Sequence, residues 1–284
     1  MDQSEIVDSS RGRPGLIRTG EQLRMEGNIE QSRASDPLDR VIDLAAVRWS
    51  TVVAALALLA GSILRLIQLD IHALSSAEAN WAFDSFLFYR GQTPPAGEHI
   101  SSTGPLAIIS QAASFFLFGV TDATARIPGA LFGIGAMALV LGLRPFFGRP
   151  AVTGILVMMA ISPTLVLASR NEPTTSAGVF SLMLVLVSLM RAGDQASSSA
   201  SRARWAAGFG IGLGMVIGSG PAALSGLVAL AFGIAVSLFL GNEETPARLA
   251  FREFFSPSRN WVVAGIGLIA TLLLLFTRLF TELS

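Results

Sequence analysis

The sequence has no cysteine, no lysine and only two histidines among its 284 residues. The lack of cysteine excludes disulfides, thiolate nucleophiles and cysteine-ligated zinc or iron–sulfur sites. His72 and His99 are too few to build a histidine-rich metal site, and as single loop residues they are expected to be structural. Charged residues make up only 14% of the chain, against about 25% in soluble domains. The net charge of zero gives no reason to expect nucleic acid as a partner.

What the chain has instead is apolar sequence, with 51% hydrophobic residues and a mean hydropathy of +0.59. A transmembrane helix needs about 20 mainly apolar residues. Three of the candidate segments begin at a tryptophan, a residue favoured at membrane interfaces. These patterns predict an all-α polytopic membrane protein with about seven spans, at residues 49–69, 126–146, 150–169, 173–190, 205–219, 222–240 and 261–280.

The apolar segment Pro105–Phe118 is too short for a regular span, and the arginines decide its placement. If it does not cross and the N-terminus is cytoplasmic, the arginine-bearing loops after the second, fourth and sixth spans all lie inside. If it crosses, those loops move outside. The positive-inside rule favours the first topology, with the N-terminus in the cytoplasm of a multi-pass protein of the plasma (inner) membrane.

This topology makes residues 70–125 one long outer loop. Ser76–Arg90 has an apolar face and is expected to lie in the membrane interface, so the loop contains two juxtamembrane helices joined by the turn-rich stretch Gly91–Gly104. Residues 1–47 are polar and of mixed charge, with no apolar core for a signal peptide. They are predicted to be a largely disordered cytoplasmic tail, separate from the transmembrane domain 48–284.

Two outer carboxylates are candidates for chemistry. Glu78 opens the first juxtamembrane helix and Glu172 lies in the short turn between two spans. Either acid could take a proton from an acceptor hydroxyl or hold a divalent ion. The alternative is that Glu78 stabilises a helix N-terminus and Glu172 is a solvated loop charge. No metal site is predicted beyond this.

Two arginines are candidates for substrate binding. The guanidinium of Arg170 suits phosphate oxygens, although an interfacial arginine that reaches lipid headgroups has the same pattern. Arg65 lies inside the first span, where it either pairs with Asp70 or Glu78 or contacts substrate. The glycines of residues 208–220 lack the Gly-Lys-Ser/Thr ending of a phosphate loop. Their four-residue spacing, like that of Gly129 and Gly133, predicts close helix packing.

Several short segments occur in a characteristic order between Leu64 and Arg170. They are LRLIQL (64–69), LSSAEA (74–79), GPL (104–106), FLFGVTDATARIPGALFG (116–133), LRP (143–145), SPTL (162–165) and Ser169-Arg170. This ordered set resembles the N-terminal half of the polytopic GT-C glycosyltransferases, in the branch of protein mannosyltransferases and the lipid A aminoarabinose transferase. Beyond Arg170 the similarity continues only as hydrophobicity.

The resemblance implies two juxtamembrane helices in the first outer loop and transfer of a sugar from a polyprenyl-phosphate carrier to an acceptor at the outer face. It also implies an Asp-Glu pair in that loop, which here is Ala77-Glu78, and histidines where this chain has Ser75, Ser76 and Thr103. A second acid is expected from the next outer loop, and Glu172 comes earlier than that acid would.

Two functions therefore stay open at this point. The first is a glycosyltransferase that uses Glu78, Glu172 and Arg170. The second is a catalytically inactive relative, retained as a scaffold or accessory subunit with a partner membrane protein, which the alanine at position 77 favours. A transporter is disfavoured because no predicted span carries paired charges.

Overall fold

The computed structural model describes residues 49–71, 73–92, 104–194, 197–240, 254 and 258–277. The chain divides into two units, Met1–Val47 and Arg48–Ser284, and all described residues lie in the second. The predicted tail and both histidines are outside the described residues. The regular elements within these ranges are all helical: α2 (Trp49–Leu66), α3 (Ser76–Tyr89), α4 (Pro105–Phe118), α5 (Asp122–Val140), η2 (Leu141–Leu143), α6 (Arg144–Ile161), α7 (Pro163–Asn171), α8 (Pro173–Ala192), α9 (Ser199–Gly218), α10 (Pro221–Leu240) and α12 (Ser258–Phe276).

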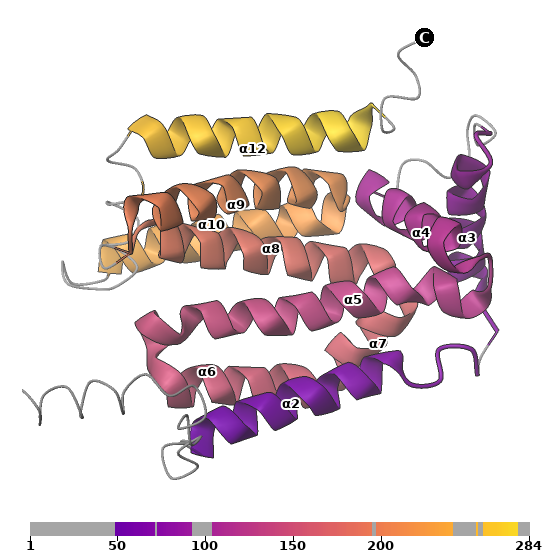
Figure 1. Ribbon diagram of the computed structural model, residues 1–284, viewed down its shortest axis with the longest axis horizontal. Helices are drawn as coiled ribbons and strands as arrows, with labels where there is room; N and C mark the ends of the chain where they lie inside the picture. Colours follow the sequence, from indigo (N-terminus) through magenta and orange to yellow (C-terminus); the bar gives the residue numbers. More distant parts are fainter. Residues whose placement is uncertain are drawn as a thin grey trace, which may run out of the picture. The chain divides into compact units, whose positions relative to one another are not determined.

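The long helices α2, α5, α6, α8, α9, α10 and α12 form a bundle in which consecutive members run in alternate directions (Figure 1). Helix α8 packs against α5, α9 and α10, and α9 also packs against α12. The short helices α3, α4 and α7 lie at the end of the bundle where α2 finishes. The architecture is that of an all-α polytopic membrane protein.

Helix α4 does not cross the bundle. Figure 1 shows that α2 finishes and α5 starts at the same end, with α3 and α4 packed together between them in the chain. A crossing by α4 would have placed the start of α5 at the opposite end. The predicted pair of juxtamembrane helices is therefore confirmed.

Five stretches in the described part of the chain are long and apolar enough to cross a membrane: Trp49–Leu66, Asp122–Ile161, Pro173–Ala192, Pro221–Leu240 and Arg259–Phe276. The 40-residue stretch contains both α5 and α6, which run in opposite directions on either side of η2. Helix α9 also runs the length of the bundle. It is less apolar than these five stretches, because its first turns carry Arg202 and Arg204. Six of the seven predicted spans thus correspond to one helix each, and the remaining one, 150–169, falls in α6 and α7.

Several helices have other bounds than the predicted spans, because local capping determines where a helix begins. The predicted span 126–146 starts at Asp122, since Thr121 caps that helix through the backbone N–H of Thr124. The predicted span 150–169 is two helices, α6 and α7, because the Ser162 hydroxyl and Pro163 start a new helix there. The predicted span 205–219 starts six residues earlier, after the cap Ser198.

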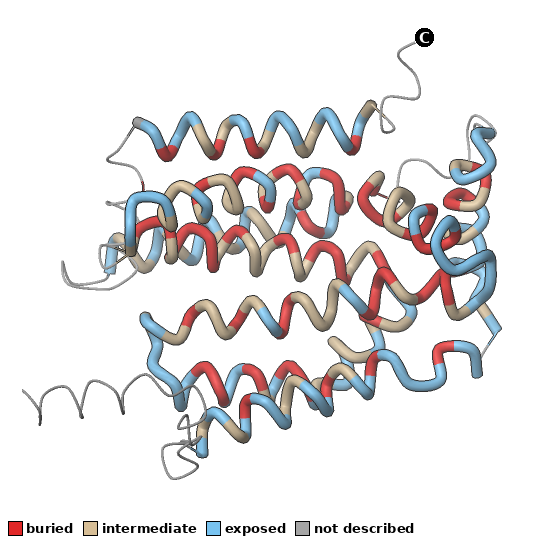
Figure 2. The backbone as a smooth tube through the Cα atoms, viewed as in Figure 1, coloured by how far each residue is buried: buried red, intermediate tan, exposed pale blue. Residues whose placement is uncertain are grey.

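Glycines allow the closest helix contacts, as their spacing predicted. A methyl group at Gly133 of α5 would lie 2.7 Å from Ser169 Cβ and 2.9 Å from Arg65 Nε. A methyl group at Gly210 of α9 would overlap the backbone carbonyl of Ala264 in α12. Small residues that let backbones approach are typical of membrane helix interfaces. The largest core cluster lies where α2, α5, α6 and α8 meet, and Figure 2 shows buried residues on the inner faces of these helices.

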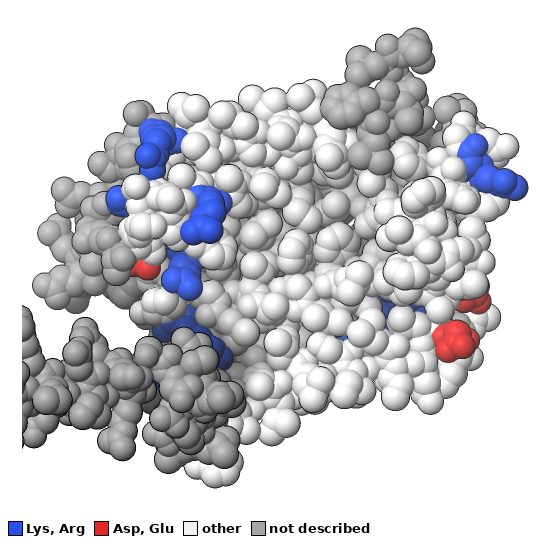
Figure 3. Space-filling view, in the orientation of Figure 1, with Lys and Arg blue, Asp and Glu red and all other residues white. Residues whose placement is uncertain are grey.

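The charged side chains gather at the two ends of the bundle, with an uncharged band between them (Figure 3). The end opposite α3 and α4 is rich in arginine. These arginines belong to the first turns of α6, α9 and α12 and to the last turn of α8. Apolar side chains such as Ile63, Val228 and Ile266 are exposed along the helices. An exposed apolar band between two polar ends is the expected surface of a membrane-spanning bundle.

Candidate functional site

The candidate site is the end of the bundle that carries α3 and α4, because all four residues predicted for chemistry belong to elements that meet or finish there. Glu78 is in the first turn of α3, and Arg65 is in the last turn of α2. Arg170 is in the last turn of α7, and Glu172 joins α7 to α8. The structure therefore confirms that both acids are on the same side of the bundle.

Glu78 has two structural partners. Its carboxylate accepts the backbone N–H of Ser75, while the Ser75 hydroxyl accepts the N–H of Glu78, which is a capping box. Arg126 of α5 also forms a two-pronged ion pair with it, with Nε–Oε1 at 3.0 Å and Nη2–Oε2 at 3.1 Å. Both side chains are more than 90% buried. The carboxylate thus stabilises the helix start, as the alternative reading of the sequence proposed.

Arg126 is the residue that sequence reasoning missed. Besides Glu78, it donates hydrogen bonds to the carbonyls of Leu69 at 2.7 Å and Ala73 at 3.3 Å. One guanidinium thereby joins the segment after α2, helix α3 and helix α5. The sequence shows only an arginine near the start of a span, where headgroup contact is the ordinary expectation. The ion pair spans 48 residues, and no local spacing could reveal it.

The environment of Glu78 lowers its pKa. Burial raises the pKa of this carboxyl, but hydrogen bonds from Arg126 and Ser75 and the charge of Arg126 lower it more, and the net pKa is below the ordinary value. A carboxyl that loses its proton so readily holds a reacting proton poorly. Its two acceptor oxygens are also already engaged, which makes Glu78 a weak candidate for a general base.

This lowered pKa predicts a pH dependence of stability. A group whose pKa is lower in the folded state stabilises the fold above its unfolded pKa, which is about 4.3 for glutamate. That stabilisation is lost as the pH falls through the folded pKa. The melting temperature of the wild-type chain in detergent should therefore fall more steeply below about pH 4 than that of Glu78→Gln. Parallel melting curves for the two proteins over the acid range would contradict this expectation.

The contact between α3 and α4 is also polar. The Ser85 hydroxyl of α3 donates to Gln111 Oε1 of α4 at 2.7 Å, and Gln111 Nε2 donates to the carbonyl of Ala125 at 2.9 Å. Phe83 of α3 is 55% exposed, while Leu87, one turn further along the helix, is buried. Helix α3 thus turns polar groups toward the bundle and presents Phe83 to the surroundings, as expected of an interfacial helix.

Arg65 does not pair with Asp70 or Glu78. Its side chain is 1% exposed, and its two Nη atoms donate to the carbonyls of Gly61 and Met159, both at 3.0 Å. Its Nε is buried and has no hydrogen-bond partner. The cavity beside it measures about 10 Å³, which is room for one water molecule and far too little for a phosphate. In this conformation, Arg65 is a structural residue.

Arg170 and Glu172 are both accessible. Arg170 donates to the carbonyls of Leu64 at 3.2 Å and Gln68 at 3.0 Å, where α2 finishes with Gln68 at a positive φ of 54°. A cation is favourable there, at the negative end of the helix dipole. Glu172 accepts a hydrogen bond from Thr175 at 2.8 Å and forms no ion pair with any described residue. Among the two predicted acids, it is the carboxylate without a cationic partner.

The described residues contain no group of three or more histidine, aspartate or glutamate side chains that could hold a metal ion. The divalent ion considered from the sequence therefore stays a hypothesis.

No protein-family model matches the chain. Over 109 residues, it is 31% identical to a curated protein of Bacillus subtilis (strain 168) named "Putative mannosyltransferase YycA". The match covers 38% of this chain and 16% of that protein.

Three solved structures share the fold. ArnT from Cupriavidus metallidurans in the apo state superposes with a TM-score of 0.58 and 18% identity, over 84% of this chain and 45% of ArnT. ArnT bound to undecaprenyl phosphate gives 0.56 and 17%, over 82% and 42%. The S. cerevisiae protein O-mannosyltransferase Pmt1-Pmt2 complex bound to the sugar donor gives 0.57 and 16%, over 82% and 34%. The chain spans less than half the length of these proteins. It shares its fold with part of each of them.

Proposed function

We propose that the chain is a membrane glycosyltransferase module that takes a sugar from a polyprenyl-phosphate donor at the α3–α4 end of the bundle. The observation that carries this proposal is the shared fold over more than 80% of the chain with ArnT bound to undecaprenyl phosphate and Pmt1-Pmt2 bound to its sugar donor. The order of segments from Leu64 to Arg170 supports it independently. We place this end at the outer membrane face, because the opposite end holds most of the described arginines.

In this proposal, Glu172 rather than Glu78 takes the acceptor proton. Its carboxylate is exposed and has no arginine partner among the described residues, whereas that of Glu78 is held by Arg126. The acceptor hydroxyl loses its proton to Glu172, its oxygen bonds to the sugar carbon, and the bond from that carbon to the carrier phosphate breaks. The departing phosphate gains negative charge, which the guanidinium of Arg170 would stabilise.

The test uses the full chain in proteoliposomes with radiolabelled undecaprenyl-phosphate mannose and an extract of membrane acceptors. Wild-type protein should transfer label, and Glu172→Gln should lower the rate by about a hundredfold or more, which is the typical contribution of a positioned base. Asp122→Asn is the matched control, since Asp122 is an exposed acid at the start of α5 on the same side. Unchanged transfer by Glu172→Gln would exclude Glu172 as the base.

A second function rests on the first outer loop. Ala77 stands where the resemblance implies an aspartate, and the adjacent Glu78 is fully engaged in structural contacts. These residues fit a catalytically inactive GT-C-like subunit that acts through a partner membrane protein. Lack of transfer by the wild-type chain, together with recovery of a stoichiometric membrane partner, would favour this second function.

A further inference from the structure

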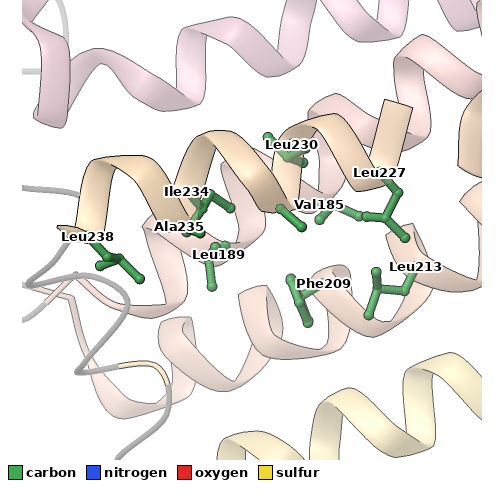
Figure 4. A pocket seen from close by; sticks show the side chains of 10 residues that line it. Val185, Leu189, Phe209, Leu213, Leu227, Leu230, Ile234, Ala235 and Leu238 are labelled. Carbon is green, nitrogen blue, oxygen red and sulfur yellow. The ribbon is translucent and has the colours of Figure 1, made fainter. Parts of the chain in front are cut away.

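Helices α8, α9 and α10 enclose a groove away from the candidate site. Figure 4 shows its lining, with side chains of α10 opposite Phe209 and Leu213 of α9 and Val185 of α8. The cavity measures about 300 Å³. The lining positions in α10 are 227, 230, 231, 234, 235 and 238, which form one stripe of a helix.

The lining is made entirely of leucine, isoleucine, valine, alanine and phenylalanine side chains. A sugar or a lipid headgroup would lose its hydrogen bonds with water there and gain none in return. An empty groove would forfeit the van der Waals contacts that hold membrane helices together. The chemistry of the groove therefore suits a hydrocarbon chain.

The size of the groove fits a single hydrocarbon chain. From Leu227 to Leu238 the lining follows α10 for eleven residue steps, which is roughly 16 Å. A groove of about 300 Å³ along that length accepts one extended hydrocarbon chain.

One end of the groove opens toward arginines. Leu238 is two residues from the end of α10 and Leu189 is three residues from the end of α8, so both lie at the arginine-rich end of the bundle. Arg202 of α9 precedes Phe209 by seven residues, which places it on the same helix face about 10 Å nearer that end. The guanidinium of Arg202 makes no hydrogen bond or ion pair in the described part of the chain.

A second cation lies close to Arg202. The guanidinium of Arg191 lies 5.9 Å from the centre of the Trp205 ring, and Trp205 is three residues from Arg202 on α9. Among the described residues, Arg191 forms an ion pair only with Asp194, at 3.9 Å, and its Nε lacks a hydrogen-bond partner. Basic side chains between membrane helices at the cytoplasmic side are typical binding sites for anionic headgroups.

From these observations, we propose that the groove holds one acyl chain of an anionic phospholipid whose phosphate contacts Arg202. The charge at the mouth requires an anion, and the lining requires a hydrocarbon tail. This site is at the opposite end of the bundle from the proposed donor site, so it does not depend on glycosyl transfer. Ala223 is the one buried residue of α10 in the described structure. The bound lipid would therefore add contacts that hold α10 against α8 and α9.

The test compares purified full-length variants in nanodiscs of phosphatidylcholine with and without phosphatidylglycerol. Phosphatidylglycerol should raise the melting temperature of wild-type protein, and native mass spectrometry should detect it bound. Arg202→Gln should weaken this binding about fivefold, the equivalent of about 1 kcal/mol for one arginine at an anionic surface. Arg204→Gln is the control, because Arg204 is exposed and lies about 140° around α9 from Phe209.

A second pair of variants tests the groove itself. Ala231→Phe and Ala235→Phe fill the cavity and should abolish lipid retention, whereas Val228→Phe, on the exposed face of α10, should retain it. Equal affinity of Arg202→Gln and wild type, or lipid retained by both filled variants, would refute the proposal. Retention of undecaprenyl phosphate in place of phospholipid, or a second protein seated on the groove, would also overturn it.

Discussion

Replacing Arg126 by methionine is expected to destabilise the described domain by about 3–5 kcal/mol, the usual effect of removing one partner of a buried ion pair. The substitution leaves the buried carboxylate of Glu78 without a counter-charge and the carbonyls of Leu69 and Ala73 without their donor. It therefore loosens three segments at once. The measurement is the temperature at which half of the protein leaves the monodisperse peak in detergent size-exclusion chromatography.

The double variant Arg126→Met/Glu78→Met separates the ion pair from the other contacts. Removing both charges eliminates the uncompensated carboxylate, so the double variant should melt at a higher temperature than Arg126→Met alone. Arg90→Met is the control, since Arg90 is exposed and its guanidinium makes a single ring contact, 5.5 Å from the centre of Phe86. If Arg126→Met melts like Arg90→Met, the ion pair does not hold this end of the bundle together.

Replacing Gly210 by leucine is expected to separate α12 from α9. Any side chain at Gly210 would overlap the carbonyl of Ala264, and its Cβ would lie 2.9 Å from the backbone nitrogen of Leu268. Backbone atoms cannot move aside as a flexible side chain can, so the effect should match or exceed the upper end of the 1–3 kcal/mol usual for an overpacked core. We expect loss of most of the monodisperse peak even before heating.

Gly265→Leu is the matched control for this variant. Gly265 lies in α12, next to Ala264, and a Cβ there has no neighbour within 4 Å. Leucine also favours a helix more than glycine does, so this control should be neutral or slightly stabilising. If both glycine variants behave alike, the close approach of α9 and α12 is not required for folding.

The apolar helices and the placement of Pro105–Phe118 at one end of the bundle could be predicted from the sequence, because both depend on local composition. A run of about 20 apolar residues has no stable alternative to a membrane helix. The arginines of the alternate loops then determined that Pro105–Phe118 stays at one end of the bundle, which the positions of α2 and α5 confirm. Helices α5 and α7 begin at Asp122 and Pro163, positions that the predicted spans do not mark, because the capping hydroxyls of Thr121 and Ser162 determine those starts.

The roles of the site residues were decided by the tertiary structure alone. The sequence offered Glu78 as a base and Arg65 as its partner or a substrate contact, and nothing local marked Arg126. In the folded chain, Arg126 forms an ion pair with Glu78, 48 residues away. Arg65 donates hydrogen bonds to the carbonyls of Gly61 and Met159 instead. A buried charge takes whichever partner the packing supplies, and that partner is a property of the assembled bundle. Composition thus determined the membrane architecture, while long-range packing decided which charges remain available for chemistry.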